Sequence, residues 1–214
     1  ASGDCGACTV VVAEAEGNQL VYRSANACIT NIGSLHGKQL ITVEDLKNDN
    51  QLHNVQQAMV DCHGSQCGFC TPGFIMSMFA LRKNNVTADP HKTIESLGGN
   101  LCRCTGYKPI IQAANQSFKS SSDDQFSEQH DVVVEHLDSI NQQYPNAHLS
   151  HLDKQFFSPS TSDELAKLLL EYPEARLLAG GTDLCLEFTQ FLREAQVLVH
   201  TGRVKDLATV ELND

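Results

Sequence analysis

The spacing of the cysteines limits what this chain of 214 residues with nine cysteines can fold into. Cys67 and Cys70 are separated by two residues in "GSQCGFCTPG", and Cys102 and Cys104 by one residue in "NLCRCTGY". Four thiolates brought together by two such loops bind either a zinc ion or an iron-sulfur cluster. A C-x-C pair is less usual in tetrahedral zinc sites, so the spacing favours an iron-sulfur cluster and leaves zinc as the alternative.

A second group of cysteines precedes the first in the chain. Cys5 and Cys8 are followed by Cys28, and the plant-type ferredoxin pattern is C-x4-C-x2-C with a distant fourth cysteine. On that pattern the first ligand lies immediately before Ala1, so we expect a fragment boundary there, with a three-ligand site as the alternative. Gly3 and Gly6 suit a loop whose amides approach sulfide closely, where a Cβ would obstruct.

The remaining cysteines and the histidines have simpler interpretations. A disulfide framework is disfavoured because the cysteine count is odd and no secretory signal is present. We expect Cys62 to be a buried thiol in the last turn of a helix and Cys185 a thiol in a strand. No histidine pairs with a cysteine at zinc-finger spacing, and His148 and His151 are expected to be solvated. No nucleophile-base arrangement is visible, so no catalytic residue is assigned.

Charge and hydropathy exclude two classes of partner. The formal net charge of −11 argues against nucleic acid, because phosphate binding relies on clustered Lys and Arg. No apolar run approaches the roughly 20 residues that span a bilayer, and the first residues do not resemble a signal peptide. These features predict a soluble, cytoplasmic protein without a membrane partner.

The first part of the chain predicts a small β-rich domain at residues 1–45. The β-branched run "TVVVAEAEGNQLVYRS" is broken by Glu16-Gly17-Asn18, which indicates strand, turn, strand. Thr42, with Asp45 three residues further on, is typical of a helix start.

Residues 46–118 change to helical spacing. Apolar side chains recur at intervals of three or four positions in two stretches: Leu52, Val55, Ala58 and Met59, then Phe74, Ile75, Met78 and Leu81. Thr71 and Pro72 suit the N-cap and first position of the second helix. With two further helices at about 90–97 and 109–118, we expect a four-helix bundle with the cysteine pairs at helix ends, where free N–H groups face an anionic cluster.

The last part of the chain changes character twice. Residues 119–154 begin with a polar run rich in serine and acidic residues, "KSSSDDQFSEQHD", which predicts a linker. Residues 155–214 indicate strand, a helix from about 162 to 170, strand and a glycine turn. An α/β domain normally needs more chain than this, so we expect an incomplete domain that continues beyond Asp214.

The glycine turn follows an apolar strand. Glycines at such a position let backbone N–H groups approach a pyrophosphate, and a threonine hydroxyl can add a hydrogen bond. The motif is short, and by itself it predicts no more than a turn. The stretch comprises Leu177, Leu178, Ala179, Gly180, Gly181, Thr182, Asp183 and Leu184.

Four motifs together resemble one family. "ASGDCGACTV", "GSQCGFCTPGFIMSMFALRK", "ESLGGNLCRCTGYKPI" and "LLAGGTDLCLE" occur in the order seen in the molybdenum hydroxylases, and are most similar to the iron-sulfur and FAD part of the xanthine dehydrogenase group. The resemblance covers residues 1–118 and about 155–214. It implies an α+β multidomain fold: a ferredoxin-like 2Fe-2S domain, a helical 2Fe-2S domain and the start of an α/β FAD-binding domain.

The resemblance also implies cofactors and site residues. One 2Fe-2S cluster would be held by Cys5, Cys8, Cys28 and the absent cysteine, and the other by Cys67, Cys70, Cys102 and Cys104. Residues 177–184 would hold the FAD pyrophosphate, with Asp183 pointing away or toward a ribose. Gln66, beside Cys67, would contact the molybdopterin of a partner, because its amide offers both a donor and an acceptor.

The implied function is electron transfer. Electrons would pass from a molybdopterin centre in a large partner subunit or domain through both clusters to FAD and on to NAD, in a heterotetramer of two small and two large chains. A role in purine catabolism follows if the substrate is xanthine. The alternatives are an aldehyde or N-heterocycle hydroxylase of the same family, a free-standing ferredoxin-like carrier and a zinc-stapled interaction module.

Overall fold

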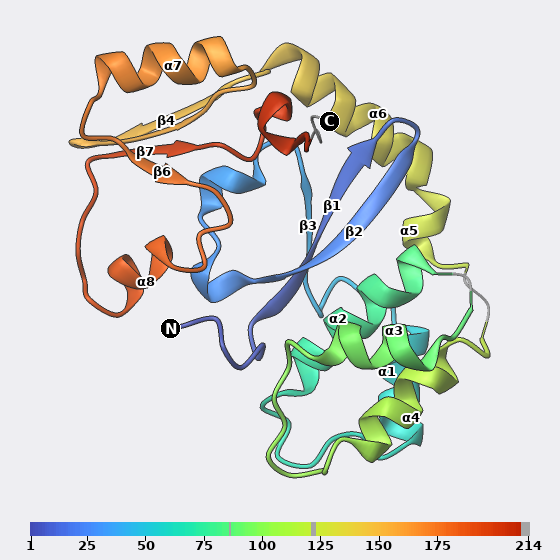
Figure 1. Cartoon of the computed structure of the whole chain (residues 1–214). Coiled ribbons are helices and arrows are strands. Elements are labelled where there is room, and N and C mark those ends of the chain that lie inside the picture. The colour runs from blue at the N-terminus through green and yellow to red at the C-terminus, as the bar shows by residue number, and fades with distance from the viewer. Residues whose placement is uncertain (86, 121–122, 211–214) are drawn as a thin grey trace, which may run out of the picture. The chain divides into compact units, whose positions relative to one another are not determined.

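The computed structural model describes residues 1–85, 87–120 and 123–210. Contacts divide the chain into two compact units. The N-terminal unit comprises Gly3–Cys28 and Lys38–Leu137, and the C-terminal unit comprises Ala1–Ser2, Ile29–Gly37 and Asp138–Asp214. Both units contain helices and strands, so the fold is mixed α and β (Figure 1).

The sheet of the N-terminal unit is built on a hairpin. Strands β1 (Thr9–Glu16) and β2 (Gln19–Asn26) pair antiparallel around Gly17, whose φ is 62°, so the expected strand, turn, strand is confirmed. Strand β3 (Gln39–Ile41) pairs antiparallel with the other edge of β1, giving the order β2-β1-β3. The β-branched residues of β1 place Val11 and Val12 in the core.

The expected helix start at Thr42 is wrong. The N–H and hydroxyl of Thr42 both donate to the Asp45 carboxylate, and Asp45 N–H donates to Thr42 O, which closes a single turn. The chain does not continue as a helix because the sequence that follows is rich in Asn and Asp, with Asp49 at a left-handed φ of 50°.

Four helices follow at the predicted places: α1 (Asn54–Asp61), α2 (Thr71–Asn84), α3 (Pro90–Leu97) and α4 (Lys108–Ser117). Helix α2 is central, because every residue from Gly73 to Arg82 is buried and it packs against β1, β2 and the other three helices. Its N-cap is Cys70 instead of the predicted Thr71, whose hydroxyl donates to Ser65 Oγ at 2.7 Å.

Regular structure continues through the segment that was predicted to be a linker. Helices α5 (Gln125–Glu128) and α6 (His130–Gln143) lie there. Phe126, Val134 and Leu137 are buried in the core. The apolar residues of α6 recur at helical spacing, and their burial stabilises a helix in a segment whose serine and acidic residues had predicted a linker. Short 3-10 helices lie at η1 (Ala27–Ile29), η2 (Ile32–Leu35) and η3 (Lys205–Ala208).

The C-terminal unit contains a four-stranded sheet in the order β4-β5-β7-β6. Strands β4 (Ala147–His151) and β5 (Lys154–Ser158) form an antiparallel hairpin, while β6 (Arg176–Leu178) and β7 (Val197–His200) are parallel to each other and β7 is parallel to β5. Helix α7 (Ser162–Glu171) connects β5 to β6 as predicted, and its N-terminus is a capping box of Thr161 and Glu164. Helix α8 (Leu184–Thr189) follows the glycine turn.

Residues Ile29–Gly37 belong to the C-terminal unit although they come early in the chain. A Cβ at Gly33 would overlap the ring of Phe156, which shows how closely the segment lies on β5. His36 Nε2 lies 2.8 Å from Tyr144 O, and Arg203 Nη1 donates to His36 O at 3.2 Å.

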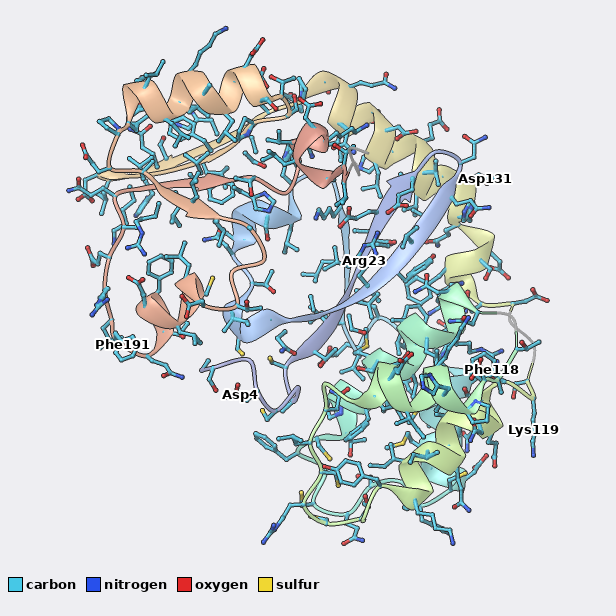
Figure 2. The ribbon with its side chains drawn as sticks, in the orientation of Figure 1. Asp4, Arg23, Phe118, Lys119, Asp131 and Phe191 are labelled. Carbon is cyan, nitrogen blue, oxygen red and sulfur yellow. The ribbon has the colours of Figure 1, made fainter. Side chains whose placement is uncertain are left out.

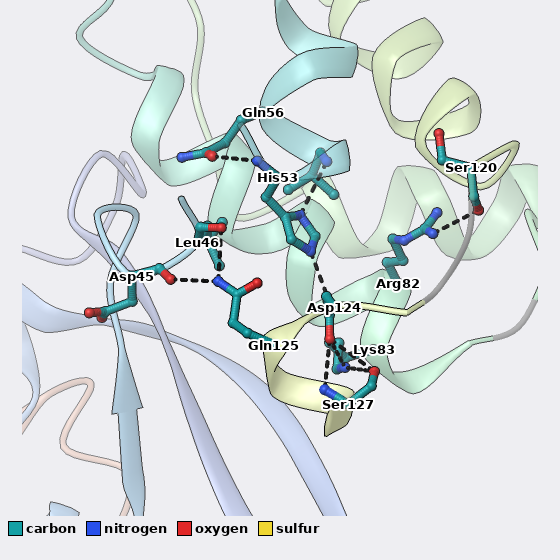
Figure 3. Close-up of polar contacts among 11 residues, drawn as sticks. Asp45, Leu46, His53, Gln56, Arg82, Lys83, Ser120, Asp124, Gln125 and Ser127 are labelled. Atoms are coloured by element: carbon teal, nitrogen blue, oxygen red, sulfur yellow. Dashed lines mark hydrogen bonds and ion pairs between the residues drawn. The ribbon is translucent and has the colours of Figure 1, made fainter. Parts of the chain in front are cut away.

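A buried charged cluster joins α1, α2 and α5 (Figure 3). Asp124 accepts from His53 Nε2 at 3.1 Å, from Lys83 Nζ at 2.9 Å and from the N–H of Ser127 at 2.8 Å. Val55 N–H donates to His53 Nδ1, so the other ring nitrogen is free to donate to Asp124. Nothing in the local sequence indicated this cluster, because its bonded partners His53 and Asp124 lie 71 positions apart.

Candidate metal centres and flavin loop

The four cysteines of the helical region lie in two loops at helix ends. Cys67 and Cys70 precede α2, with Cys70 at its N-cap, while Cys102 and Cys104 lie between α3 and α4. Both loops turn through left-handed backbone, with φ of 85° at Gly68 and 66° at Gly106. These glycines let each loop reverse sharply enough to direct its thiols to a common side.

The four thiols meet as two pairs. Burial and then a hydrogen bond with Cys102 raise the pKa of Cys70 to about 11. A hydrogen bond with Cys67 is the first cause that raises the pKa of Cys104. Each pair therefore combines one cysteine of the first loop with one of the second.

Cys102 has an environment that favours its thiolate. Burial by itself would raise its pKa, but hydrogen bonds from the Thr105 hydroxyl and from the N–H groups of Thr105 and Cys104 outweigh burial and lower the pKa to about 7. The Thr105 Oγ1 atom lies 3.1 Å from Cys102 Sγ. The thiolate is the form that binds metal, so this loop is prepared to act as a ligand near neutral pH.

The paired arrangement suits a two-iron cluster. A 2Fe-2S cluster needs two thiolates on each of two irons, and the loops supply two pairs. The residues present therefore fit such a cluster.

Two of the three cysteines of the N-terminal group, Cys8 in the first loop and Cys28 in η1, lie together. Cys28 N–H lies 3.4 Å from Cys8 Sγ, and burial followed by a hydrogen bond with Cys8 raises the pKa of Cys28. Cys5 is exposed. Gly3 and Gly6 have φ of 76° and 67°, in the left-handed region that favours glycine.

The other predicted residues have ordinary surroundings. Cys62 is the C-cap of α1, and its Sγ lies 3.3 Å from Gln116 Oε1. Cys185 is buried in helix α8, so the prediction that it lies in a strand is wrong: the chain turns at Gly181 and starts a helix instead of extending the strand. His148 stacks on Phe157 with ring centroids 4.4 Å apart. Gln66 is exposed.

The glycine turn connects β6 to α8. Leu178 is buried at the end of β6. Gly181 has a φ of 77°, and a Cβ added at this glycine would lie only 3.0 Å from Cys185 Sγ. Gly180, Thr182 and Asp183 are exposed, while Gly181 is half-buried. The backbone of this loop is accessible to an anion, which suits the predicted pyrophosphate contact.

A hollow of about 390 Å³ lies beyond α8 in the same unit. Its lining includes Phe188, Leu192, Arg193 and Lys154. Phe191, the chain neighbour of Leu192, lies at the tip of the loop after α8 (Figure 2). The guanidinium carbon of Arg193 lies 5.5 Å from the centroid of the Phe191 ring. Glu194 also lines the hollow and pairs with Lys154 at 3.2 Å, so the hollow combines apolar side chains with charges of both signs.

Comparisons with known proteins match both regions. Residues 42–115 match the family described as "2Fe-2S binding domain", and residues 151–214 match "FAD binding domain in molybdopterin dehydrogenase". Aldehyde oxidase 3 from Rattus norvegicus is 31% identical over 97% of this chain and 19% of its own length. Xanthine dehydrogenase from Blastobotrys adeninivorans is 52% identical over 53% of this chain and 8% of its own length. The structure of aldehyde oxidoreductase from Desulfovibrio gigas is 34% identical over 54% of this chain and 12% of that chain, with a TM-score of 0.47.

An iron-sulfur domain followed by a flavin domain of this type defines the class. The chain belongs to the molybdenum hydroxylase family and corresponds to its iron-sulfur and FAD-binding region, which confirms the resemblance. It spans less than a fifth of the length of the curated relatives named above, 19% and 8%. The described residues form no helix that is both long and apolar enough to cross a membrane.

Proposed function

We propose that the chain is the electron-transfer part of a xanthine dehydrogenase-like molybdenum hydroxylase, an oxidoreductase. When bound, two 2Fe-2S clusters and FAD supply one-electron and two-electron carriers between a partner's molybdopterin centre and NAD. The observation that carries the proposal is the meeting of four thiols as two pairs, from the loops that precede α2 and α4.

The residues of the chain have distinct roles in this proposal. Residues 46–118 provide the ligands Cys67, Cys70, Cys102 and Cys104. The Thr105 hydroxyl stabilises the Cys102 thiolate by its hydrogen bond, and such bonds to sulfur also tune a cluster's potential. Residues 1–45 provide Cys5, Cys8 and Cys28 for the second cluster. No residue of the chain is assigned to the chemistry of the substrate.

The flavin loop acts through its backbone. The N–H groups of the exposed residues Gly180 and Thr182 would bind the FAD pyrophosphate, and Asp183 would point away from it or toward a ribose. Residues 155–214 are the first part of the FAD-binding domain, separated from the helical domain by residues 119–154.

The partner surface includes exposed apolar side chains beside the cysteines. Phe69 is 75% exposed and Leu101 is 55% exposed, and each lies next to a ligand in the chain. Gln66 is exposed beside Cys67 and would contact the partner's molybdopterin. Apolar groups exposed in this way are typical of a protein interface. The proposal places the chain in a cytoplasmic heterotetramer of two small and two large chains.

Metal analysis and spectroscopy of the purified protein test the proposal. We expect iron and acid-labile sulfide, visible absorption, and two distinct paramagnetic signals after reduction. Cys67→Ser or Cys102→Ser removes one signal and leaves the other, because each cluster has its own ligands. Cys62→Ser and Cys185→Ser are matched controls that retain both signals, since their thiols bond or pack elsewhere.

Other results would count against the proposal. A colourless protein that contains zinc would indicate an interaction module held together by the same thiols. Retention of both signals in Cys67→Ser would remove that residue from the ligand set. Oxidation of an aldehyde, but not of xanthine, by the assembled enzyme would keep the electron-transfer role and change the substrate.

A further inference from the structure

A buried asparagine connects the two cysteine regions of the N-terminal unit. Asn100 is only 3% exposed. Its Nδ2 donates to Gly6 O at 3.0 Å and to Thr9 Oγ1 at 3.1 Å, and its Oδ1 accepts from Ser77 Oγ at 2.6 Å. Both donors of the amide are therefore satisfied on the N-terminal loop, while α2 fixes the orientation of its oxygen.

The backbone next to Asn100 makes a second connection. Leu101 N–H donates to Cys5 O at 2.9 Å. Cys102 is the next residue along the chain, so a single hydrogen bond joins the residue before Cys102 to Cys5 itself.

Two glycines permit this close approach. A Cβ at Gly73 in α2 would overlap the carbonyl oxygen of Gly6, and a Cβ at Gly6 would overlap the carbonyl oxygen of Gly99. Gly6 lies between Cys5 and Cys8, and Gly73 lies three residues after Cys70. The two cysteine loops are thus in backbone contact without intervening side chains.

We propose that Asn100 is a positioning residue that fixes the loop of Cys5 and Cys8 against the loop of Cys102, and so sets the separation of the two clusters. The inference rests on the proposed function, since it assumes that both loops hold clusters. The ordinary alternative is an asparagine that only fills the core. The two roles differ in one respect: a positioning residue controls how one loop moves relative to the other.

Two variants and one control separate these roles. Asn100→Ala removes the hydrogen bonds. Asn100→Asp keeps the size of the side chain and the acceptor for Ser77 but replaces the donor that faces Gly6 O. Asn84→Ala is the control, because Asn84 also joins α2 to the sheet through Tyr22, with Tyr22 N–H donating to Asn84 Oδ1 at 3.1 Å, yet it touches neither cysteine loop.

The first measurement is hydrogen exchange in the purified holoprotein, followed in a peptide that contains Leu101. The Leu101 amide is protected by its bond to Cys5 O. We expect about tenfold faster exchange in both Asn100 variants and unchanged exchange at this site in Asn84→Ala. A tenfold change corresponds to about 1.4 kcal/mol, which is the scale of one lost hydrogen bond.

The second measurement is the magnetic interaction between the two reduced clusters. Dipolar broadening of their paramagnetic signals falls with the cube of the separation. We expect the broadening to decrease in both Asn100 variants while both signals remain, and to stay at the wild-type value in Asn84→Ala. If the broadening decreases while the iron content stays constant, the separation of the clusters has changed and no cluster has been lost.

Several results would overturn the inference. Wild-type exchange and wild-type broadening in a folded Asn100→Asp protein would leave Asn100 as a core residue only, even if Asn100→Ala failed to fold. Equal changes in Asn84→Ala would show general loosening. If the wild-type protein held no iron, the proposed function would fail on its own, and the exchange measurement would still report on the contact of the loops.

Discussion

Asp124 shows how one side chain can order a polar segment. Its carboxylate is 6% exposed and receives hydrogen bonds from His53, from Lys83 and from both the N–H and the hydroxyl of Ser127. Burial by itself would raise the pKa of Asp124, but these bonds and the charge of Lys83 hold it well below its usual range. The ionised form is therefore favoured by folding.

The consequence is a defined dependence of stability on pH. A carboxylate whose pKa is lowered by folding contributes stability above its unfolded pKa of about 3.9, and this contribution is lost as pH falls through the lower folded pKa. We expect Asp124→Asn to lower the free energy of unfolding by about 3 kcal/mol at pH 7, because it leaves Lys83 with one partner fewer in a buried site. Urea unfolding at several pH values measures this, and the difference from the wild type should shrink below about pH 4.

Asp131 provides the matched control. It lies on the adjoining helix α6 and points into solvent (Figure 2), where it pairs with His130 at 2.8 Å. Asp131→Asn should change stability little, because an exposed ion pair is screened by water. A loss in Asp124→Asn that stayed constant down to pH 2 would mean that the carboxylate charge is not what stabilises the cluster.

Site residues could be predicted from the sequence where their role shows in local spacing, and could not where it depends on hydrogen-bond partners far away in the chain. Cys67, Cys70, Cys102 and Cys104 carry a chemical type and a spacing that point to metal ligation without knowledge of the fold. Asn100 has no such pattern, since its partners Gly6 and Thr9 lie 94 and 91 positions away. A polar residue becomes informative only when the fold has brought distant segments together.

At the scale of elements, α2 is constrained on all sides. The ten residues from Gly73 to Arg82 are buried, so the helix has no solvent face in that stretch. Pro72 in the first turn and the apolar spacing after it made this helix predictable. The depth of its burial was not predictable, because it depends on the β1-β2 hairpin and on three other helices.

Gly73→Ala tests this constraint. Alanine is favoured over glycine inside a helix by about 1 kcal/mol, but the added Cβ would overlap Gly6 O. Overpacking against backbone typically destabilises by about 1–3 kcal/mol, so we expect the variant to be less stable than the wild type. Urea unfolding measures the change, with Gly99→Ala as control because a Cβ added at Gly99 would meet nothing within 4 Å among the described residues. A stabilised Gly73→Ala protein would show that the N-terminal loop moves away from the added Cβ at little cost in free energy.

The misassigned elements have a common physical cause. Thr42 and Asp45 form the hydrogen bonds of a helix start but are followed by residues that favour turns, so one turn forms and stops. Helix α6 lies in a polar segment but carries Val134 and Leu137 at helical spacing, and both are buried. Local signals set where a helix can begin, while burial decides whether it persists.

At the scale of the whole molecule, the seven cysteines proposed as cluster ligands all lie in the N-terminal unit. Cys5, Cys8 and Cys28 come from its first part and the other four from its second part. Metal binding is coupled to folding where the ligands come from distant parts of the chain, because a ligand that binds only the folded state stabilises that state.

Removal of iron should therefore affect one unit. We expect chelation to increase hydrogen exchange around the cysteine loops and in α2, and to leave β4, β5 and α7 of the C-terminal unit unchanged. Exchange followed by mass spectrometry before and after chelation measures both units in one sample. Equal loss of protection in both units, or none near the cysteines, would contradict the assignment of the ligands.

The segment Ile29–Gly37 makes the C-terminal unit discontinuous in sequence. The polypeptide leaves the N-terminal unit at Cys28 and returns at Lys38, having supplied Gly33 to the packing of Phe156 and the carbonyl of His36 to Arg203. No single break in the gene can then yield two self-contained pieces. A fragment starting at residue 138 would lack the segment Ile29–Gly37, which packs against its Phe156. The complementary fragment would contain this segment without the residues that it packs against. A shuffled or permuted version of this chain would have to move those nine residues together with the flavin region.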